Sequence, residues 1–447
     1  MNKLANVILS LGLVFLLAIL VYGIQGWIDG ALLTEEIFLY LAVPAAGVVL
    51  LLICFKLDRE KKASVALCFV AVGGAVYAAE AYLVLSERRN EVELDFVNEL
   101  RRQGDNAYPF IHPEALLEPG PDGGLRSVLN IDGLEFLPLA QISKSLSVAC
   151  NELGENMVYQ MDRHGFRNSE ETWTAEEIDI AAIGDSFVEG DCVGPEDNMI
   201  AWVKRSYPKT LNLGVGGTGP LEQLGILKEY ARPFRPKIVT WVFYEGNDWS
   251  NLESAKESPL LLRYLEPGFT QGLLQRQREI DQKLADYVLD RMAKAVPEPR
   301  SGQLDSFLKL RTLRTRLLWA RHKERKERHY DVALFEAILT AAKDSVESWG
   351  GRLHFVYLPS AARYFGDDLD REELLTMQRR VRDLITRLDI AFIDVAAVFE
   401  AKKQPERFWF HPNSHYNEEG YQLAAQTILN ALSAPLDQSG YPSLGGS

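Results

Sequence analysis

The chain has 447 residues, 47% of them hydrophobic, and is too long for one ordinary domain. Its formal net charge of −14 argues against nucleic acid as a partner, because phosphate binding needs a broad basic face. It has no CxxC or HExxH spacing, so we expect neither a bound metal ion nor another cofactor.

Three apolar stretches open the chain, at residues 4–24, 37–55 and 64–85. Each is close to the roughly 20 residues that cross a bilayer as a helix. We therefore expect residues 1–87 to form a membrane anchor with three transmembrane helices. The alternative for the first stretch is a cleaved signal peptide, but its apolar run is longer than usual for one and lacks a small-x-small cleavage site.

Positive charges predict how this anchor is oriented, because cytoplasmic loops retain Lys and Arg. Such residues precede the first span and fill the loop between the second and third, at Lys3, Lys56, Arg59, Lys61 and Lys62. Only Arg88 and Arg89 flank the opposite side, and they argue weakly the other way. We expect an integral protein of the bacterial inner membrane whose remaining residues are extracytoplasmic. Glu80, near the outer end of the third span, either marks a functional or packing site or reaches water.

The four cysteines divide into two pairs. Cys54 and Cys68 lie in predicted spans, where a thiol is usually a small apolar side chain. Cys150 and Cys192 lie in the outward portion, where oxidation is permitted. A disulfide between them would close a loop of roughly 40 residues, which the chain-entropy model values at on the order of 4 kcal/mol. The alternative is two free thiols.

After the anchor, residues 88–172 are predicted to form a stalk and a preface. Residues 88–104 have charges on most faces of a helix, and residues 105–172 are rich in Pro, Gly and short apolar runs. We expect a helical stalk followed by a small, irregular, partly β segment.

From there to residue 434, strand and helix patterns alternate. Strands are predicted at 177–183, 209–213, 237–244, 352–358 and 390–394, with amphipathic helices near 196–206, 220–231, 331–349 and 370–388. Such alternation predicts an α/β domain over residues 173–434: a three-layer, doubly wound, parallel sheet of five strands. Ligands of such sheets bind at the carboxyl ends of the strands.

Two further segments interrupt or follow this domain. Residues 250–330 show no strand pattern and should form a helical insertion. Its ten Lys or Arg between residues 300 and 330 form either a solvated helix face or a basic arm near anionic lipid headgroups or an acidic glycan. The tail at 435–447 should be disordered.

Polar residues follow the first three predicted strands. Ser186 stands in the turn Gly184-Asp185-Ser186, where it could be a nucleophile or a helix cap. A glycine-dense loop containing Gly217 follows the second strand, and Asn247 and Asp248 follow the third. Backbone N–H groups and an Asn amide at adjacent strand ends could together stabilise a tetrahedral oxyanion.

A serine nucleophile needs a base, and His415 precedes a late predicted helix, which places its ring at the same edge. His411 in HPN is the weaker alternative, because it stands nine residues before Gly420 rather than five. The other histidines have no such context and are expected to be structural or on the surface: His112, His164, His322, His329 and His354.

These motifs resemble the four ordered blocks of the SGNH (GDSL-like) hydrolase superfamily: GDSFVEG, the Gly217 loop, GND and His415 before N-x-x-G. The resemblance covers about residues 160–433, including MDRHGFRN, which is similar to the lead-in of membrane-anchored bacterial members. It implies an SGNH or flavodoxin-like fold, with Ser186 as nucleophile and His415 as base. It also implies an oxyanion hole from the Ser186 and Gly217 N–H groups and the Asn247 side chain, with Asp185 and Asp248 as supporting residues.

One departure concerns the third member of a catalytic triad. The family usually has an Asp two or three residues before its His, where this chain has Pro412 and Asn413. An Asn can orient the imidazole but cannot stabilise the imidazolium. Three outcomes are open: a dyad oriented by Asn413 or a backbone carbonyl, a third member recruited elsewhere, such as Asp394 or Asp248, or a weakened catalyst.

The resulting hypothesis is a membrane-anchored serine esterase or O-acyltransferase that acts through an acyl-serine on a cell-surface glycan or lipid. The first half-reaction is the same for hydrolysis and transfer, so the motifs do not separate them. The alternative is a catalytically weak or inactive glycan-binding or assembly protein, which the missing Asp favours. A third hypothesis is that the spans relay an acyl donor across the bilayer, but three spans with one acidic residue are too few for this role.

Overall fold

The computed structural model describes residues 2–28, 41–121, 123–294, 310, 313, 330–366, 368–412 and 414–433. The chain divides into two compact units: Met1–Arg89 with Pro297–Glu324, and Asn90–Val296 with Arg325–Ser447. Most of the basic run predicted at 300–330 and the whole tail at 435–447 lie outside the described residues.

The first unit contains long apolar helices. They are α1 (Asn2–Ile28), α3 (Val43–Cys54) and α4 (Arg59–Arg102), whose residues from Asn90 onward belong to the second unit. Among the described residues, two windows are long and apolar enough to cross a membrane, Lys3–Gln25 and Arg59–Tyr82. The sequence predicted a third, but α3 has 12 residues, which is too short to span a bilayer alone, and the predicted start at 37–40 is outside the described residues.

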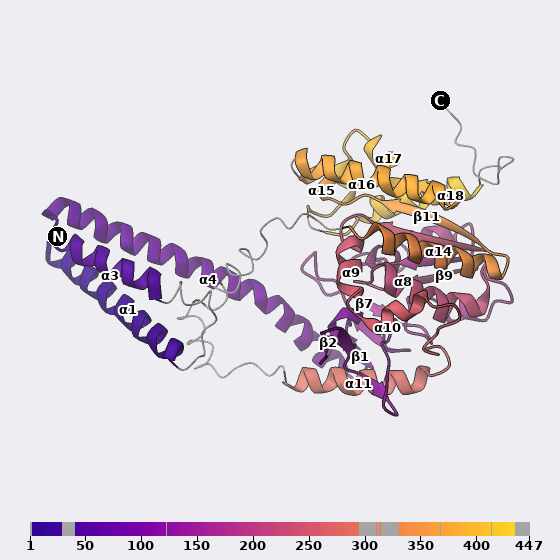
Figure 1. Ribbon diagram of the computed structural model, residues 1–447, viewed down its shortest axis with the longest axis horizontal. Helices are drawn as coiled ribbons and strands as arrows, with labels where there is room; N and C mark the ends of the chain where they lie inside the picture. Colours follow the sequence, from indigo (N-terminus) through magenta and orange to yellow (C-terminus); the bar gives the residue numbers. More distant parts are fainter. Residues whose placement is uncertain are drawn as a thin grey trace. The chain divides into compact units, whose positions relative to one another are not determined.

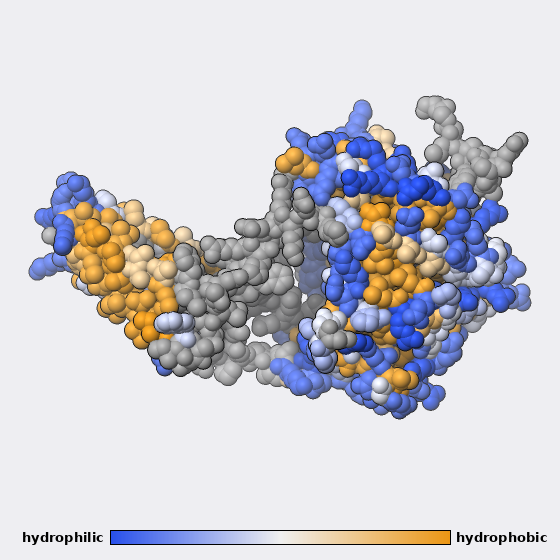
Figure 2. All heavy atoms as spheres, viewed as in Figure 1, coloured by the Kyte–Doolittle hydropathy of each residue, from blue (hydrophilic) through white to orange (hydrophobic). Residues whose placement is uncertain are grey.

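The surface of α1 and α3 is apolar, as Figure 2 shows for the first unit. Large hydrophobic side chains exposed on these two helices include Leu4, Val7, Leu11, Val14, Val21, Val49, Leu50 and Leu52. Helices that are hydrophobic on their exposed faces are typical of membrane spans or of signal sequences.

The second unit is built on a five-stranded parallel sheet, as predicted. Its strands are β8 (Ile180–Gly184), β9 (Thr210–Gly214), β10 (Ile238–Tyr244), β11 (Arg352–Leu358) and β12 (Ala391–Asp394), in the order β12-β11-β10-β8-β9. Gly184 pairs with Gly214, so β8 and β9 end together, and β10 lies on the other side of β8. The loops after β9 and β10 therefore flank the turn that follows β8.

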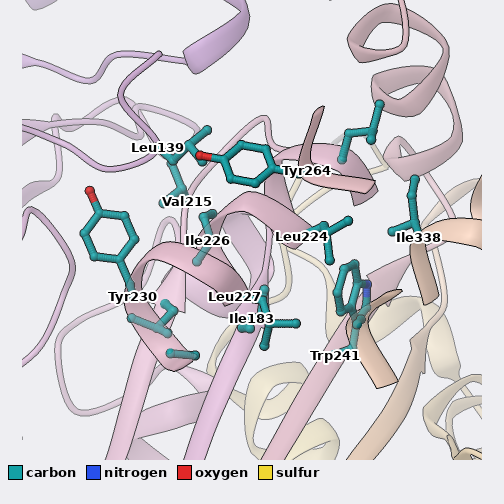
Figure 3. Packing of buried hydrophobic residues seen from close by; sticks show 14 of the residues in the cluster. Leu139, Ile183, Val215, Leu224, Ile226, Leu227, Tyr230, Trp241, Tyr264 and Ile338 are labelled. Atoms are coloured by element: carbon teal, nitrogen blue, oxygen red, sulfur yellow. The ribbon is translucent and has the colours of Figure 1, made fainter. Parts of the chain in front are cut away.

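Helices cover both faces of this sheet (Figure 1). Side chains of β8 alternate between two hydrophobic clusters: Ile180 and Ala182 pack into one, Ala181 and Ile183 into the other. The first cluster includes side chains of α7 (Met199–Lys204), α17 (Val395–Glu400) and α18 (Glu418–Ser433). The second includes α8 (Pro220–Ile226), α14 (Val332–Ser348) and α16 (Asp368–Arg387). Figure 3 shows part of this second cluster, where Ile183 and Trp241 lie against Leu224, Leu227 and Ile338.

Residues 105–172 belong to the same compact unit as the sheet and contain short strands. They form a three-stranded sheet, β1 (Ala107–Pro109), β6 (Leu146–Val148) and β7 (Val158–Gln160), and two small antiparallel pairs, β2 (Leu117–Pro119) with β3 (Leu125–Ser127) and β4 (Asn130–Ile131) with β5 (Leu134–Glu135). The remaining helices are α5 (Glu170–Trp173), α6 (Ser186–Glu189), α9 (Asp248–Ala255), α10 (Pro259–Leu262), α11 (Gln277–Lys294) and α15 (Ala362–Phe365).

Candidate active site

The turn after β8 presents Ser186 at the start of α6. A Cβ at Gly184 would lie 2.5 Å from Val188 Cγ2 and 2.8 Å from the Val242 carbonyl oxygen, so only glycine allows the chain to turn this closely to β10. The Asp185 carboxylate accepts from the Phe187 N–H at 3.0 Å and caps the helix. Ser186 thus stands at the carboxyl edge of the sheet.

His415 reaches this serine from the far end of the chain. Its Nε2 lies 2.8 Å from Ser186 Oγ. A β-bridge between Trp409 and Tyr416 holds the chain just after His415, and the Asn417 side chain accepts from the Gly420 N–H at the start of α18. At His411, the weaker alternative, the backbone N–H donates to the Ser414 hydroxyl, and the backbone carbonyl accepts from that hydroxyl.

The other ring nitrogen of His415 contacts a carboxylate, which comes from Glu152 in the loop between β6 and β7. Glu152 Oε1 lies 2.9 Å from His415 Nδ1, and Oε2 accepts from the His415 backbone N–H, also at 2.9 Å. A carboxylate only accepts, so Nδ1 carries a proton and Nε2 is left to accept from the serine hydroxyl. Serine, imidazole and carboxylate are arranged as in a catalytic triad.

This geometry corrects the candidates for a third member that the sequence suggested. Asp394 caps α17 through Ala397 and bonds to Gln378. Asp248 is fully buried and accepts from the Tyr244 N–H at 3.0 Å, which anchors the turn after β10. Neither carboxylate lies on His415, because each is held by the element it caps or anchors. Asn413 lies outside the described residues.

Sequence reasoning missed Glu152, although one signal pointed toward it. Cys150 and Cys192 are joined by a disulfide, and Glu152 stands two residues after Cys150. The pairing expected from the sequence already tied this loop to the turn after Ser186, so an acid beside Cys150 was a candidate for the site.

The electrostatics follow from burial and these contacts. Burial alone would lower the pKa of His415, but the Glu152 hydrogen bond and the nearby carboxylates of Asp191, Glu152 and Asp185 raise it above its ordinary value. Burial opposes ionisation of Glu152, yet the hydrogen bonds and charge of His415 lower its pKa. Burial raises the pKa of Asp185 to about 6, although the Phe187 N–H partly offsets the rise.

The loop after β9 carries the second group of predicted residues. A Cβ at Gly214 would lie 2.2 Å from the Glu189 backbone nitrogen, and the Gly216 N–H donates to Glu189 Oε2 at 2.7 Å, so this loop is drawn against α6. Gly217 has a φ of 77°, and its carbonyl accepts from the Asn251 side chain at 3.0 Å. A left-handed φ at this position favours glycine.

Asn247 begins α9 in the loop after β10, on the other side of Ser186. Its Oδ1 is buried without a hydrogen-bond partner among the described residues. Two adjacent loops thus place Gly217 and Asn247 beside the serine turn, where the sequence expected an oxyanion hole.

His112, expected to be structural or on the surface, lies against this glycine loop. Its Nδ1 is 3.2 Å from the Gly216 carbonyl oxygen, and a Cβ at Gly217 would come within 2.5 Å of the same nitrogen. The segment before the sheet therefore supplies two side chains, Glu152 and His112, to the surroundings of Ser186.

One group of described residues brings three potential metal ligands together, Cys150, Glu152 and Cys192. The two sulfurs are bonded to each other, and the carboxylate already accepts from His415. These atoms are therefore engaged in the disulfide and in the triad arrangement.

The known proteins that resemble this chain do so at low sequence identity. No protein-family model and no curated protein matches the chain. Similar solved structures include a lipase/acylhydrolase from Enterococcus faecalis (14% identity, 56% of this chain and 93% of that chain, TM-score 0.32) and the acetyl xylan esterase AlAXEase (11%, 57% and 100%, 0.33). An acetylxylan esterase from Geobacillus stearothermophilus is also similar (13%, 58% and 95%, 0.33).

The order of strands and the place of each motif are independent of these scores. Ser186, Gly217 and Asn247 follow β8, β9 and β10, and His415 precedes α18, the last helix among the described residues. This arrangement agrees with the fold that the resemblance to SGNH hydrolases implied. A shared fold does not by itself assign a substrate.

Proposed function

We propose that the protein is a membrane-anchored serine esterase or O-acyltransferase of the SGNH type. The observation that carries the proposal is the relay from Ser186 Oγ through His415 to Glu152, with hydrogen-bond distances of 2.8 and 2.9 Å.

The first half-reaction follows from the geometry. Ser186 Oγ attacks the carbonyl carbon of an acyl ester while His415 Nε2 takes the hydroxyl proton. Glu152 stabilises the imidazolium that forms, and the negative oxygen is held by the N–H groups of Ser186 and Gly217 and the Asn247 amide. The C–O bond of the ester then breaks, and His415 returns its proton to the leaving alcohol.

The second half-reaction decides between hydrolysis and transfer. The acyl-serine is attacked by water or by a sugar hydroxyl while His415 takes the proton; the bond between the acyl carbon and Ser186 Oγ then breaks, and His415 returns the proton to Oγ. We favour an acetyl or similar acyl group on a cell-surface glycan or lipid, outside the cytoplasm. The two apolar windows of α1 and α4 support an anchor, and the disulfide supports an oxidising compartment.

The competing hypothesis, a catalytically weak glycan-binding protein, depended on the missing Asp before His415. Glu152 places a carboxylate on His415 Nδ1 from another part of the chain, so the missing Asp no longer favours an inactive protein.

The test is turnover of a chromogenic acetyl ester by the full chain in detergent. We expect activity in the wild type and its loss in Ser186→Ala and His415→Ala, together with labelling of Ser186 by a fluorophosphonate. Equal rates in wild type and Ser186→Ala would refute the proposal. Acyl transfer is then tested by adding an oligosaccharide acceptor and analysing the products by mass.

A further inference from the structure

The loop that carries Glu152 has few attachments of its own. Between β6 and β7 the chain turns through residues 151–157, with Leu153 58% exposed. Internal bonds close the turn, from the Met157 N–H to the Cys150 carbonyl and between Asn151 and Asn156. In the part of the chain that the structure describes, residues 151–156 bond beyond the turn through Glu152 alone, to His415 and, from its backbone N–H, to Cys150 Sγ. Exposed turns of this kind open readily.

The disulfide fixes this turn to the nucleophile's own segment. Cys192 is buried and stands two residues after Gly190, the left-handed cap of α6. Its N–H donates to the Tyr159 hydroxyl at 2.8 Å, and the preceding N–H, of Asp191, donates to the Ser186 carbonyl at 3.0 Å. The far end of the disulfide is therefore rigidly placed relative to Ser186.

The same disulfide lies beside the imidazole. Cys192 Sγ is 3.4 Å from His415 Nδ1, the nitrogen that Glu152 also contacts. The Glu152 backbone N–H in turn points to Cys150 Sγ at 3.5 Å. The bond thus joins the turn to the serine segment at the point where the carboxylate meets the ring.

We propose that the Cys150–Cys192 disulfide is a positioning element of the reaction, which holds Glu152 on His415 Nδ1. This inference rests on the proposed function. Without the disulfide the turn of residues 151–157 is released, and the site becomes a Ser186–His415 dyad. A dithiol performs the conversion by giving two electrons and two protons to the disulfide, which yields two thiols while the dithiol becomes a disulfide itself.

The consequence for His415 can be followed by its titration. The groups that face it are Glu152 from the turn, Asp185 and Asp191 from the serine segment, and the Phe187 ring at 4.9 Å. When Glu152 leaves, burial and the two aspartates remain, so the pKa of His415 falls.

The experiment compares three full-length proteins: Cys150→Ser/Cys192→Ser, Glu152→Gln, and the two combined. We expect the double cysteine variant to lose kcat/KM by the same factor as Glu152→Gln, about 10²-fold. In the Glu152→Gln background, removal of the disulfide should cause no further loss, because both changes act on one contact. Equal losses in both backgrounds, or wild-type kcat/KM without the disulfide, would overturn the proposal.

A second readout does not need turnover. Histidine labelled with ¹⁵N, with the His415 signals assigned from His415→Gln, reports the pKa of that ring directly. In a Cys54→Ser/Cys68→Ser control, which keeps the disulfide cysteines, the pKa of His415 should fall on treatment with dithiothreitol. In Glu152→Gln, dithiothreitol should leave the pKa of His415 unchanged. An unchanged His415 pKa on reduction contradicts the proposal even where the double cysteine variant fails to fold. Wild-type protein without ester turnover would refute the proposed function, and the titration would still report on the positioning.

Discussion

Replacement of Glu152 by glutamine tests the triad most directly. The side chain keeps its shape and its oxygen can still accept from His415 Nδ1, but the charge is lost. Glutamine also cannot accept from both His415 N–H groups, each now held at 2.9 Å, because one of its two terminal atoms is a donor. The variant therefore removes the charge that stabilises the imidazolium and leaves one of the two His415 N–H groups without an acceptor.

The expected loss of kcat/KM follows from the contact between Glu152 and His415. A hydrogen bond to a charged group contributes about 1.5–3 kcal/mol, and a charge pair at about 4 Å near a protein surface about 4 kcal/mol. Because the side chains of Glu152 and His415 are each 21% exposed, water screens part of this attraction. We therefore expect Glu152→Gln to lose about 3 kcal/mol of transition-state stabilisation, which lowers kcat/KM about 10²-fold.

The pH dependence of kcat/KM provides an independent test of the same contact. Glu152 and the neighbouring carboxylates raise the pKa of His415, and the base must be neutral to act, so kcat/KM rises with pH through that pKa. Glu152→Gln lowers the His415 pKa and moves the rising limb to lower pH. The assay is hydrolysis of a chromogenic acetyl ester across pH, with Glu155→Gln, an exposed acid on the same turn, as the control. An unchanged rate and an unchanged limb in Glu152→Gln would show that the carboxylate is not part of the relay.

Three further predictions concern stability, each measured by urea unfolding of the full chain in detergent. Gly214→Ala places a Cβ 2.2 Å from the Glu189 nitrogen and should cost about 3 kcal/mol or prevent folding; an unchanged midpoint would contradict the close packing of this loop on α6. Arg363→Met leaves the buried Glu245 carboxylate without its ion pair and should cost about 3–5 kcal/mol, whereas a loss below about 1 kcal/mol would mean that the pair is solvated. Burial lowers the pKa of His354 from 6.5 to about 4, so its neutral form stabilises the fold above pH 6.5 and this contribution is lost as pH falls toward 4. His354→Gln should remove about 3 kcal/mol of that pH dependence, and identical pH profiles of stability in both proteins would refute the assignment.

Much of the fold and half of the site could be predicted from the sequence, because both depend on local patterns. Apolar runs of strand length, alternating with amphipathic helices, specify a parallel sheet, and the crossovers of such a sheet bring all its carboxyl ends to one edge. Ser186, Gly217 and Asn247 each follow a strand directly, so their grouping required only the strand boundaries. The second predicted span, 37–55, stays a prediction, since the structure describes the helix Val43–Cys54 in it and residues 37–40 lie outside the described residues.

The partner of the imidazole was decided by tertiary structure alone. Glu152 lies 263 residues from His415 in the chain, in an exposed turn with no strand end or helix start to mark it. Its place at the site depends on a sheet of three short strands and on a covalent link to the serine segment. Local patterns determine where strands end, whereas the meeting of an irregular loop with a distant ring is set by packing and cross-linking over the whole unit, which no stretch of sequence encodes by itself.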